Sequence, residues 1–236
     1  MSTRRILVTG PVGALEPWLE AADAGGWIAV VWPLVHVRQQ PGLVVERGGE
    51  LPEWIAVTSA NALPALERAA AERPEILELS FGAVGENTPQ RARAIGFRPT
   101  LVAPTEAELA RALLELPERP SRVLWPRGSL AKDFGAALRA EGLTVLDPIV
   151  YATVPLHHDE APPPADAVLF ASPSGVRAWH ESARPSALPA RVIAIGPTTA
   201  AALERAGVRR GEVHALETPT PRALAALLRS WTKERE

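Results

Sequence analysis

The feature that most constrains the fold of this chain is an internal duplication. The segments 81–96 and 191–207 each contain a short apolar run that stops at a glycine, Gly85 or Gly196, and each then reads as a helix that a second glycine closes. In both segments a threonine lies three residues after the first glycine, and the second glycine lies eleven residues after the first. These threonines are Thr88 and Thr199. We therefore expect one strand–helix pattern to occur twice.

The duplication continues on both sides of these segments. The further matching pairs are Val57–Asn61 with Phe170–Ser174, Ala103–Glu106 with Thr218–Pro221, Ile6–Thr9 with Val123–Pro126, and Pro33–Val35 with Pro148–Val150. Each half then holds five apolar strands that alternate with helices. This alternation is typical of an α/β fold whose parallel sheet is covered by helices on both faces.

The order of the matched segments predicts two domains, of which the first is discontinuous. Residues 1–36 and 153–236 form the first α/β domain, and residues 37–152 form the second as a continuous insert. Two segments that follow prolines, Pro33–Val37 and Pro148–Ala152, read as extended chain. We expect them to lie side by side as the connection between the domains, with the ligand site in the cleft between the two lobes.

Composition narrows the classes of function. The formal net charge is −2, so we expect neither a nucleic acid nor a membrane surface as a partner. No apolar run approaches the length of a bilayer span and no basic-then-apolar leader precedes the first strand, which favours the cytoplasm. The chain contains no cysteine, so it has neither a disulfide framework nor a thiolate nucleophile.

The histidines and acidic residues show no spacing that indicates a metal site. His157 and His158 are adjacent, but they lie in a proline-rich linker, Leu156–Ala165, and we expect a solvated pair there. Trp125 and Trp179 are compatible with either a cleft or a core, and tryptophan is more often found in a core.

Small and hydroxylated residues follow the strands of both halves. In a parallel α/β sheet, ligands bind beyond the carboxyl ends of the strands. Helix N-termini at this edge offer free N–H groups and a partial positive charge to anions. The arrangement suits a large ligand with many carboxylates. The residues at these positions are Thr9, Gly10, Ser59, Asn61, Gly85, Thr88, Arg127, Ser129, Ser172, Ser174, Gly196, Thr198 and Thr199.

Two alternatives stay open at this point. Thr88, Ser172 and Thr220 each precede a proline, so each is also compatible with a simple helix cap. Tyr151 is the only tyrosine of the chain and lies on the second extended connection. It is either an interdomain packing residue or a phenol in the cleft that gives or holds one proton.

Seven motifs resemble the uroporphyrinogen-III synthase family, in the order of that family and over nearly the whole chain. The resemblance implies two flavodoxin-like domains joined by a two-stranded ladder, and a lyase of porphyrin, tetrapyrrole and heme biosynthesis that uses neither a metal nor an organic cofactor. The motifs are Val57–Ala62, Ala83–Thr88, Trp125–Gly128, Ile149–Tyr151, Ser172–Val176, Ala194–Ala200 and Thr218–Pro221.

The resemblance also implies a substrate and a reaction. The family acts on linear hydroxymethylbilane, a tetrapyrrole with acetate and propionate on every ring. Loss of the hydroxyl as water gives an azafulvene, the last ring attacks through its substituted carbon, and the spiro intermediate recloses with that ring inverted as uroporphyrinogen III. Free hydroxymethylbilane closes without inversion. The enzyme therefore has to hold a geometry that the free chain rarely adopts.

Carried over by position, the resemblance implies that Tyr151 assists departure of the hydroxyl. Arg191 stands where the family often has lysine. The first strand commonly ends Thr-Arg-Pro in the family, whereas Gly10 replaces that arginine here. If the arginine binds a carboxylate in relatives, either Arg127 or Arg177 binds it in this chain, or the carboxylate is bound more weakly. The positions at the strand ends and the resemblance together predict the substrate-binding residues Thr9, Gly10, Ser59, Thr88, Arg127, Ser172, Ser174, Gly175, Arg191, Gly196, Thr198 and Thr199.

The expected partner is thus a linear tetrapyrrole polycarboxylate, with hydroxymethylbilane synthase as a possible transient partner and a monomer as the expected state. A second class of function is also compatible with two lobes. The alternative is a bilobal cytoplasmic binding protein that closes on an anionic small molecule without catalysis.

Overall fold

The chain forms two compact units in the computed structural model, which describes residues 4–41, 43, 50–181 and 188–233. Unit 1 consists of Met1–His36 and Val154–Glu236, and unit 2 consists of Val37–Thr153. The chain passes from one unit to the other within strand β3 (Val35–Gln39) and back within strand β10 (Ile149–Pro155).

Unit 1 is built on a parallel sheet of five strands in the order β13-β12-β11-β1-β2. Central β1 is buried on both faces, as its unbroken apolar run predicts. Ile6 and Val8 face one layer of the core, and Leu7 faces the other. The strands are β1 (Arg5–Val8), β2 (Ile28–Val31), β11 (Ala167–Phe170), β12 (Arg191–Ala194) and β13 (Val213–Ala215).

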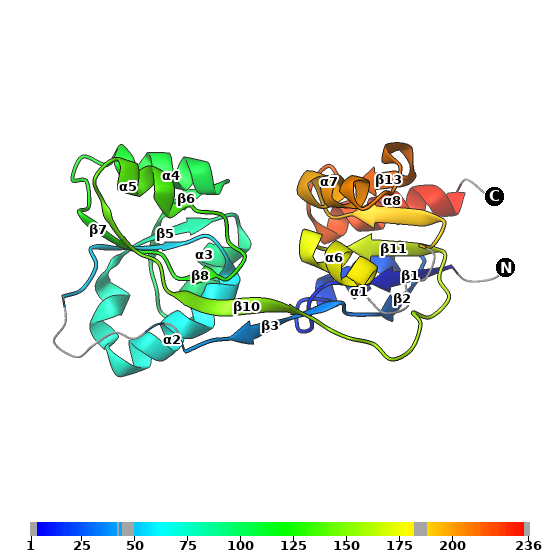
Figure 1. Cartoon of the computed structure of the whole chain (residues 1–236), viewed down its shortest axis with the longest axis horizontal. Coiled ribbons are helices and arrows are strands. Elements are labelled where there is room, and N and C mark those ends of the chain that lie inside the picture. Colours follow the sequence, from blue (N-terminus) through cyan, green and yellow to red (C-terminus); the bar gives the residue numbers. More distant parts are fainter. Residues whose placement is uncertain (1–3, 42, 44–49, 182–187, 234–236) are drawn as a thin grey trace. The chain divides into compact units, whose positions relative to one another are not determined.

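Helices cover both faces of this sheet (Figure 1). Helices α1 (Glu16–Ala24) and α8 (Pro221–Lys233) pack on the face that contains Ile6. Helices α6 (Pro173–Glu181) and α7 (Pro197–Arg205) pack on the face that contains Leu7. A short 3-10 helix, η3 (Arg210–Glu212), precedes the edge strand β13. Unit 1 is therefore a three-layer α/β fold.

Unit 2 repeats this architecture with the strand order β6-β5-β4-β7-β9, again all parallel. Helices α2 and α3 cover one face and α4 and α5 the other. The strands are β4 (Trp54–Val57), β5 (Ser80–Val84), β6 (Pro99–Ala103), β7 (Arg122–Leu124) and β9 (Thr144–Leu146). The helices are η1 (Ala60–Ala62), α2 (Leu63–Glu72), η2 (Pro74–Glu78), α3 (Asn87–Ala94), α4 (Glu106–Leu114) and α5 (Gly135–Ala140).

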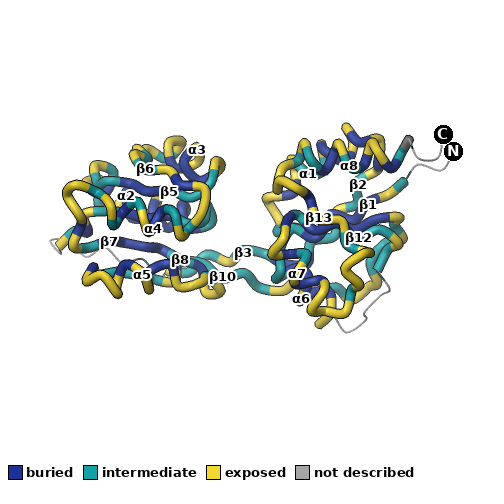
Figure 2. The backbone as a smooth tube through the Cα atoms, turned by 90° about the horizontal axis from the view of Figure 1, so that it is seen from above, coloured by how far each residue is buried: buried dark blue, intermediate teal, exposed yellow. Residues whose placement is uncertain are grey.

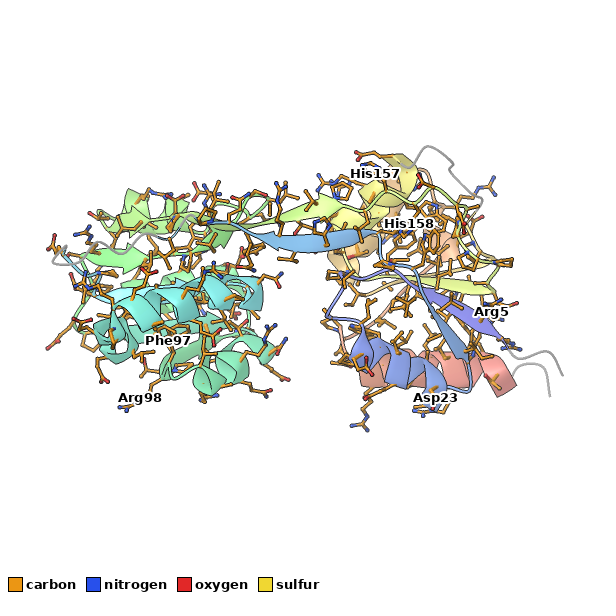
Figure 3. The ribbon with its side chains drawn as sticks, turned by 90° about the horizontal axis from the view of Figure 1, so that it is seen from below. Arg5, Asp23, Phe97, Arg98, His157 and His158 are labelled. Atoms are coloured by element: carbon orange, nitrogen blue, oxygen red, sulfur yellow. The ribbon has the colours of Figure 1, made fainter. Side chains whose placement is uncertain are left out.

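The two sheets confirm the predicted duplication. The sequence pairs β1 with β7, β11 with β4, β12 with β5 and β13 with β6, and these partners occupy the same places in the two strand orders. The buried strands lie at the centre of each unit (Figure 2). Aromatic residues fill the layers around them, as where Phe97, labelled in Figure 3, packs against Phe81 with ring centroids 5.1 Å apart.

A third sheet contains both connecting strands, in the order β3-β10-β8. The sequence predicts a turn at Pro126–Ser129 followed directly by a helix. Instead, Arg127–Gly128 forms the short strand β8, and α5 begins only at Gly135. The reason is pairing with β10, because Arg127 N donates to Pro148 O (3.0 Å) and Ser129 N donates to Tyr151 O (3.0 Å).

The histidine pair in the linker differs from the expected solvated pair. His157 is exposed, whereas His158 is half-buried (Figure 3). The His158 ring stacks on Trp32 with centroids 3.9 Å apart, and its Nε2 lies 2.6 Å from Pro33 O. His158 therefore fastens the linker to the segment before β3. Within the described part of the chain, no helix has both the length and the apolar character that crossing a membrane requires.

Candidate active site

Each unit has one place where neighbouring strands send their connections in opposite directions along the sheet. In unit 1 this switch point lies between β1, which leads on to β2, and β11, which leads on to β12. In unit 2 it lies between β4, which leads on to β5, and β7, which leads on to β9. Ligands of open α/β sheets bind in the crevice at the carboxyl ends of such a strand pair. Topology alone therefore marks one candidate ligand-binding edge in each unit.

At the switch point of unit 1, the residues after β1 and β11 lie together. Thr9 is 1% exposed, and its Oγ1 donates to Leu169 O at 2.7 Å. A Cβ atom added to Gly175 would lie 3.6 Å from Ser172 Oγ and 3.8 Å from Thr9 O. Gly10 is buried against Leu15 and Ala171. The structure thus brings together Thr9, Gly10, Ser172 and Gly175 as predicted.

Ser172 has two partners at the start of α6. Its Oγ accepts a hydrogen bond from Gly175 N at 3.2 Å, which makes it the cap of this helix, and it lies 2.9 Å from Ser174 Oγ. Thr220 caps α8 in the same way, with Oγ1 3.3 Å from Ala223 N. The capping alternative is therefore correct for both residues. It does not exclude a second role for Ser172, whose remaining hydrogen-bonding capacity lies at the switch point.

The two caps provide a matched pair of variants. Ser172→Ala and Thr220→Ala should each lower the free energy of unfolding by about 1 kcal/mol, because each leaves one helix N–H without its side-chain acceptor. Only Ser172→Ala should also lower the turnover of substrate. Denaturant unfolding and steady-state kinetics on both variants check this. Equal activity in the two variants would show that Ser172 is a cap and nothing more.

The start of α7 carries the next predicted residues. Gly196 is the N-cap residue, but it has no side chain that could accept a hydrogen bond from the helix. Pro197 follows it in the first turn. Thr199 N and Ala200 N both donate to Gly196 O. Thr198 is exposed, whereas Thr199 is 2% exposed. These two N–H groups are thus used within the first turn, which has no side-chain cap and lies at the edge of the sheet that also carries Ser172.

The corresponding helix of unit 2, α3, begins differently. Gly85 is in the left-handed region with φ +75°, whereas Gly196 is extended with φ −178°. Thr88 lies inside α3 and is 5% exposed, and the N-cap is Glu86 without a side-chain hydrogen bond. The capping alternative is therefore wrong for Thr88. The repeated sequence yields two open helix starts with different local backbone conformations.

Thr9, Thr88 and Thr199 are the buried polar residues of the described chain. Thr9 bonds to the backbone, as noted above. No described residue provides a hydrogen-bond partner for the hydroxyl of Thr88 or of Thr199. Neither hydroxyl oxygen is among the fully buried unpaired atoms of the described chain, so solvent or a ligand can reach it. These two positions therefore carry an unused hydrogen-bonding group at the expected edge of each unit.

Three further predicted positions of unit 2 lie around one 3-10 helix. Ser59 precedes η1, and its Oγ accepts from Asn61 N at 3.3 Å. Helix η1 contacts both α3 and β8. Ser59, Thr88 and Arg127 are therefore positioned by elements that touch one another.

Arg127 already has an ionic partner. Its Nε lies 3.0 Å from Asp147 Oδ2, and the same oxygen lies 3.2 Å from Arg139 Nη2. Its guanidinium also lies 5.6 Å from the centroid of Trp125. A substrate carboxylate at Arg127 would have to share it with Asp147. Arg177, the other candidate for the missing grip at Gly10, is exposed on α6.

The structure places Arg191 apart from the other predicted residues of unit 1. Arg191 is the first residue of β12 and lies opposite Ala167, the first residue of β11. It is thus at the amino ends of the strands, whereas Gly196 is at the carboxyl ends. Its guanidinium lies over Trp231 of α8, 4.5 Å from the ring centroid. This position makes Arg191 part of the packing of α8.

Tyr151 lies on β10 beside β8, and its half-buried ring packs against the core of unit 2. Its Oη has no hydrogen-bond partner among the residues that the structure describes. Sequence reasoning missed Gly128, which lies directly under the Tyr151 ring. The Trp125–Gly128 motif contained the residue, but only the pairing of β8 with β10 shows what it contacts.

Among the described residues, no group of three or more histidine or acidic side chains is placed to hold a metal ion. The pKa of Glu53 is lowered, chiefly because its carboxylate accepts hydrogen bonds from the Ser121 hydroxyl and the Ser121 N–H. Glu53 precedes β4, so this carboxylate lies at the opposite edge of the sheet from the switch point.

Comparisons with known proteins agree with this fold. A sequence profile described as uroporphyrinogen-III synthase HemD matches residues 16–226. The crystal structure of uroporphyrinogen-III synthetase from Helicobacter pylori is similar to this fold, with a TM-score of 0.69, 19% identity, and coverage of 97% of this chain and 100% of the other. A mutant uroporphyrinogen III synthase from Thermus thermophilus has a TM-score of 0.59, 17% identity, and coverage of 99% and 100%. A search among curated protein sequences found no match.

Proposed function

This chain belongs to the uroporphyrinogen-III synthase family, and from this premise we propose that it acts as a hydro-lyase on linear hydroxymethylbilane. The proposed product is uroporphyrinogen III, formed with inversion of the last pyrrole ring through a spiro intermediate. The observation that carries the proposal is the profile match over residues 16–226. The starts of α3 and α7, which lack a side-chain cap and follow β5 and β12, support the substrate class.

Binding of the substrate follows from the groups at the carboxyl ends of the strands. The starts of α3, α6 and α7 offer backbone N–H groups and helix dipoles, which favour carboxylates. Hydroxyl groups of serine and threonine lie at the same edges. We propose that these residues bind carboxylates of the substrate in each unit. A substrate held in this way can be kept in the folded-back geometry that ring inversion needs.

Tyr151 is the proposed acid of the reaction. Its Oη donates a proton to the departing hydroxyl, the carbon–oxygen bond breaks, and water leaves. The pyrrole nitrogen of the same ring supplies the electron pair and then loses its N–H proton, which the Tyr151 phenolate takes back, so that the neutral azafulvene forms. A single positioned acid or base contributes a factor of about 10² to 10⁴ to the rate of such a step.

The two unsatisfied threonine hydroxyls provide a test of substrate binding. Thr88→Val and Thr199→Val should each raise KM or lower kcat by less than about tenfold, because neighbouring amides share the same carboxylate and one neutral hydrogen bond contributes about 0.5 to 1.5 kcal/mol. Valine keeps the branched shape, and neither hydroxyl has a described protein partner. The melting temperature should therefore not fall. Unchanged kinetics in both variants would exclude contact of these hydroxyls with substrate.

An isomer assay tests the proposed function. Hydroxymethylbilane is incubated with the purified protein and with heat-inactivated protein, and the type I and type III products are oxidised and separated. We expect predominantly type III product with the active protein and type I product with the control. Type I product alone in both samples would overturn the proposal and would leave a binding protein without catalysis.

The proposal includes a cytoplasmic location, a monomeric state and transient contact with hydroxymethylbilane synthase. The last follows from the chemistry of the substrate, which closes spontaneously if it is not captured. Light scattering of the purified protein tests the monomeric state. Cross-linking with hydroxymethylbilane synthase tests the transient contact.

A further inference from the structure

Gly128 leaves no room for a side chain because the Tyr151 ring occupies that space. A Cβ atom added to Gly128 would lie 2.6 Å from Tyr151 Cε2, 2.6 Å from Cζ and 2.8 Å from Oη. Non-bonded carbon atoms normally approach to about 3.5 to 4.0 Å. The outer half of the phenol therefore rests directly on the α-carbon of Gly128.

The backbone of Gly128 does not itself require glycine. The glycines of the described chain with positive φ are Gly13, Gly26, Gly85, Gly96, Gly142 and Gly207, and Gly128 is not among them. Its conformation is open to any residue, since only positive φ strongly favours glycine. The close approach of the Tyr151 ring is thus the physical reason for glycine at this position.

Strand pairing fixes the ring over this glycine. Ile149 pairs with Arg127 and Tyr151 pairs with Gly128, so two steps of β10 match one step of β8. Such an irregularity redirects the side chain that follows it. Val150, between the two, is 0% exposed and belongs to the core of unit 2. The extra residue buries Val150 and places Tyr151 above β8.

Neighbouring contacts hold β8 in this position. Ser129 N donates to Tyr151 O, and Arg127 N donates to Pro148 O, both at 3.0 Å. The ion pair of Arg127 with Asp147 links β8 to the residue two positions before β10. The backbone on both sides of the ring is therefore fixed, whereas the Tyr151 Oη has no described hydrogen-bond partner.

We propose that Gly128 is a positioning residue, which aims the hydroxyl of Tyr151 at the substrate by letting the phenol lie on strand β8. This inference rests on the role proposed for Tyr151 above. A methyl group at position 128 would displace the ring, because the ring is the free end of a side chain and the two strands are anchored. Misplacement of a reacting group by about 1 Å can cost about 10²-fold in rate.

The kinetic test is a double-mutant cycle of wild type, Gly128→Ala, Tyr151→Phe and the double variant. Gly128→Ala should lower kcat by about ten- to a hundredfold with little change in KM, since it misplaces the acid without removing a binding group. In the Tyr151→Phe background the same substitution should change kcat less than about twofold, because the hydroxyl is already absent. Gly211→Ala is the matched control, since a Cβ atom there meets nothing within 4 Å.

A structural readout is possible because Tyr151 is the only tyrosine of the chain. Tyrosine labelled with ¹³C in the ring gives a single-site NMR signal that reports on ring position without any substrate. Gly128→Ala should shift this signal, and Gly211→Ala should not. If Gly128→Ala also lowers the melting temperature, Tyr151→Ala added to it should restore stability to that of Tyr151→Ala alone, because the clash is with the ring.

The outcomes separate this inference from the proposed function. A shifted signal with a loss of kcat that vanishes in the Tyr151→Phe background supports the inference. An unshifted signal, an equal loss of kcat in both backgrounds, or stability that Tyr151→Ala does not restore would overturn it. A shifted signal with unchanged kcat would also overturn it, and if Tyr151→Phe is unchanged as well, the proposed role of Tyr151 fails too.

Discussion

Replacing Tyr151 by phenylalanine should lower kcat for uroporphyrinogen III formation by about ten- to a thousandfold, on the scale of one positioned acid. The variant keeps the aromatic ring that rests on Gly128 and packs on the core of unit 2. It loses only the hydroxyl, which has no described partner within the protein. Binding of substrate should therefore be retained while departure of the hydroxyl is slowed.

The measurement is the rate of type III product formation, with the melting temperature as the control for folding. As catalysis slows, spontaneous closure competes and the fraction of type I product should rise. The result that counts against the account is an unchanged rate in a folded variant. Tyr151 would then be a packing residue of unit 2, the alternative that its sequence position leaves open.

Replacing Trp125 by alanine should lower the free energy of unfolding of unit 2 by about 3 to 5 kcal/mol, the usual cost of truncating a large buried aromatic. Trp125 is 1% exposed and directly follows β7. Its ring packs against Phe134, with centroids 5.3 Å apart, and lies below the guanidinium of Arg127. Its Nε1 donates to Thr58 Oγ1 at 3.3 Å, which ties the ends of β7 and β4 together.

Trp125→Phe is the matched control for this prediction. It keeps most of the apolar contact but removes the bond to Thr58, so we expect a loss of about 1 to 2 kcal/mol. Urea unfolding followed by circular dichroism gives both values. A loss below about 1 kcal/mol for Trp125→Ala would mean that the ring is not a structural centre of the switch point in unit 2.

Sequence reasoning predicted the parts of the fold that depend on local pattern. Apolar runs separated by helical segments specify a parallel α/β sheet, and the repeated spacing around Gly85 and Gly196 specifies two copies of it. Because the carboxyl ends of parallel strands lie at the same edge of a sheet, Thr9, Ser172 and Thr199 are expected at one edge of unit 1, as the structure shows. These inferences succeed because strand direction and chain order follow from connections that are short along the sequence.

Long-range contacts account for what the sequence did not predict. Strand β8 has only two residues and exists through pairing with β10, more than twenty positions later in the chain. The ion pair of Arg127 with Asp147 has the same origin. The family resemblance alone placed Arg191 among the substrate-binding residues, whereas its position at the start of β12 puts it at the opposite edge of the sheet from Gly196.

We propose that, in each unit, the carboxyl ends of the strands form the edge that binds carboxylates of a linear tetrapyrrole. The most direct test is an experimental structure of the protein with its product, uroporphyrinogen III, bound. We predict product carboxylates within hydrogen-bond distance of the starts of α3, α6 and α7, and Tyr151 Oη facing the macrocycle. A product bound at the amino ends of the strands, near Arg191 and Glu53, would contradict the account.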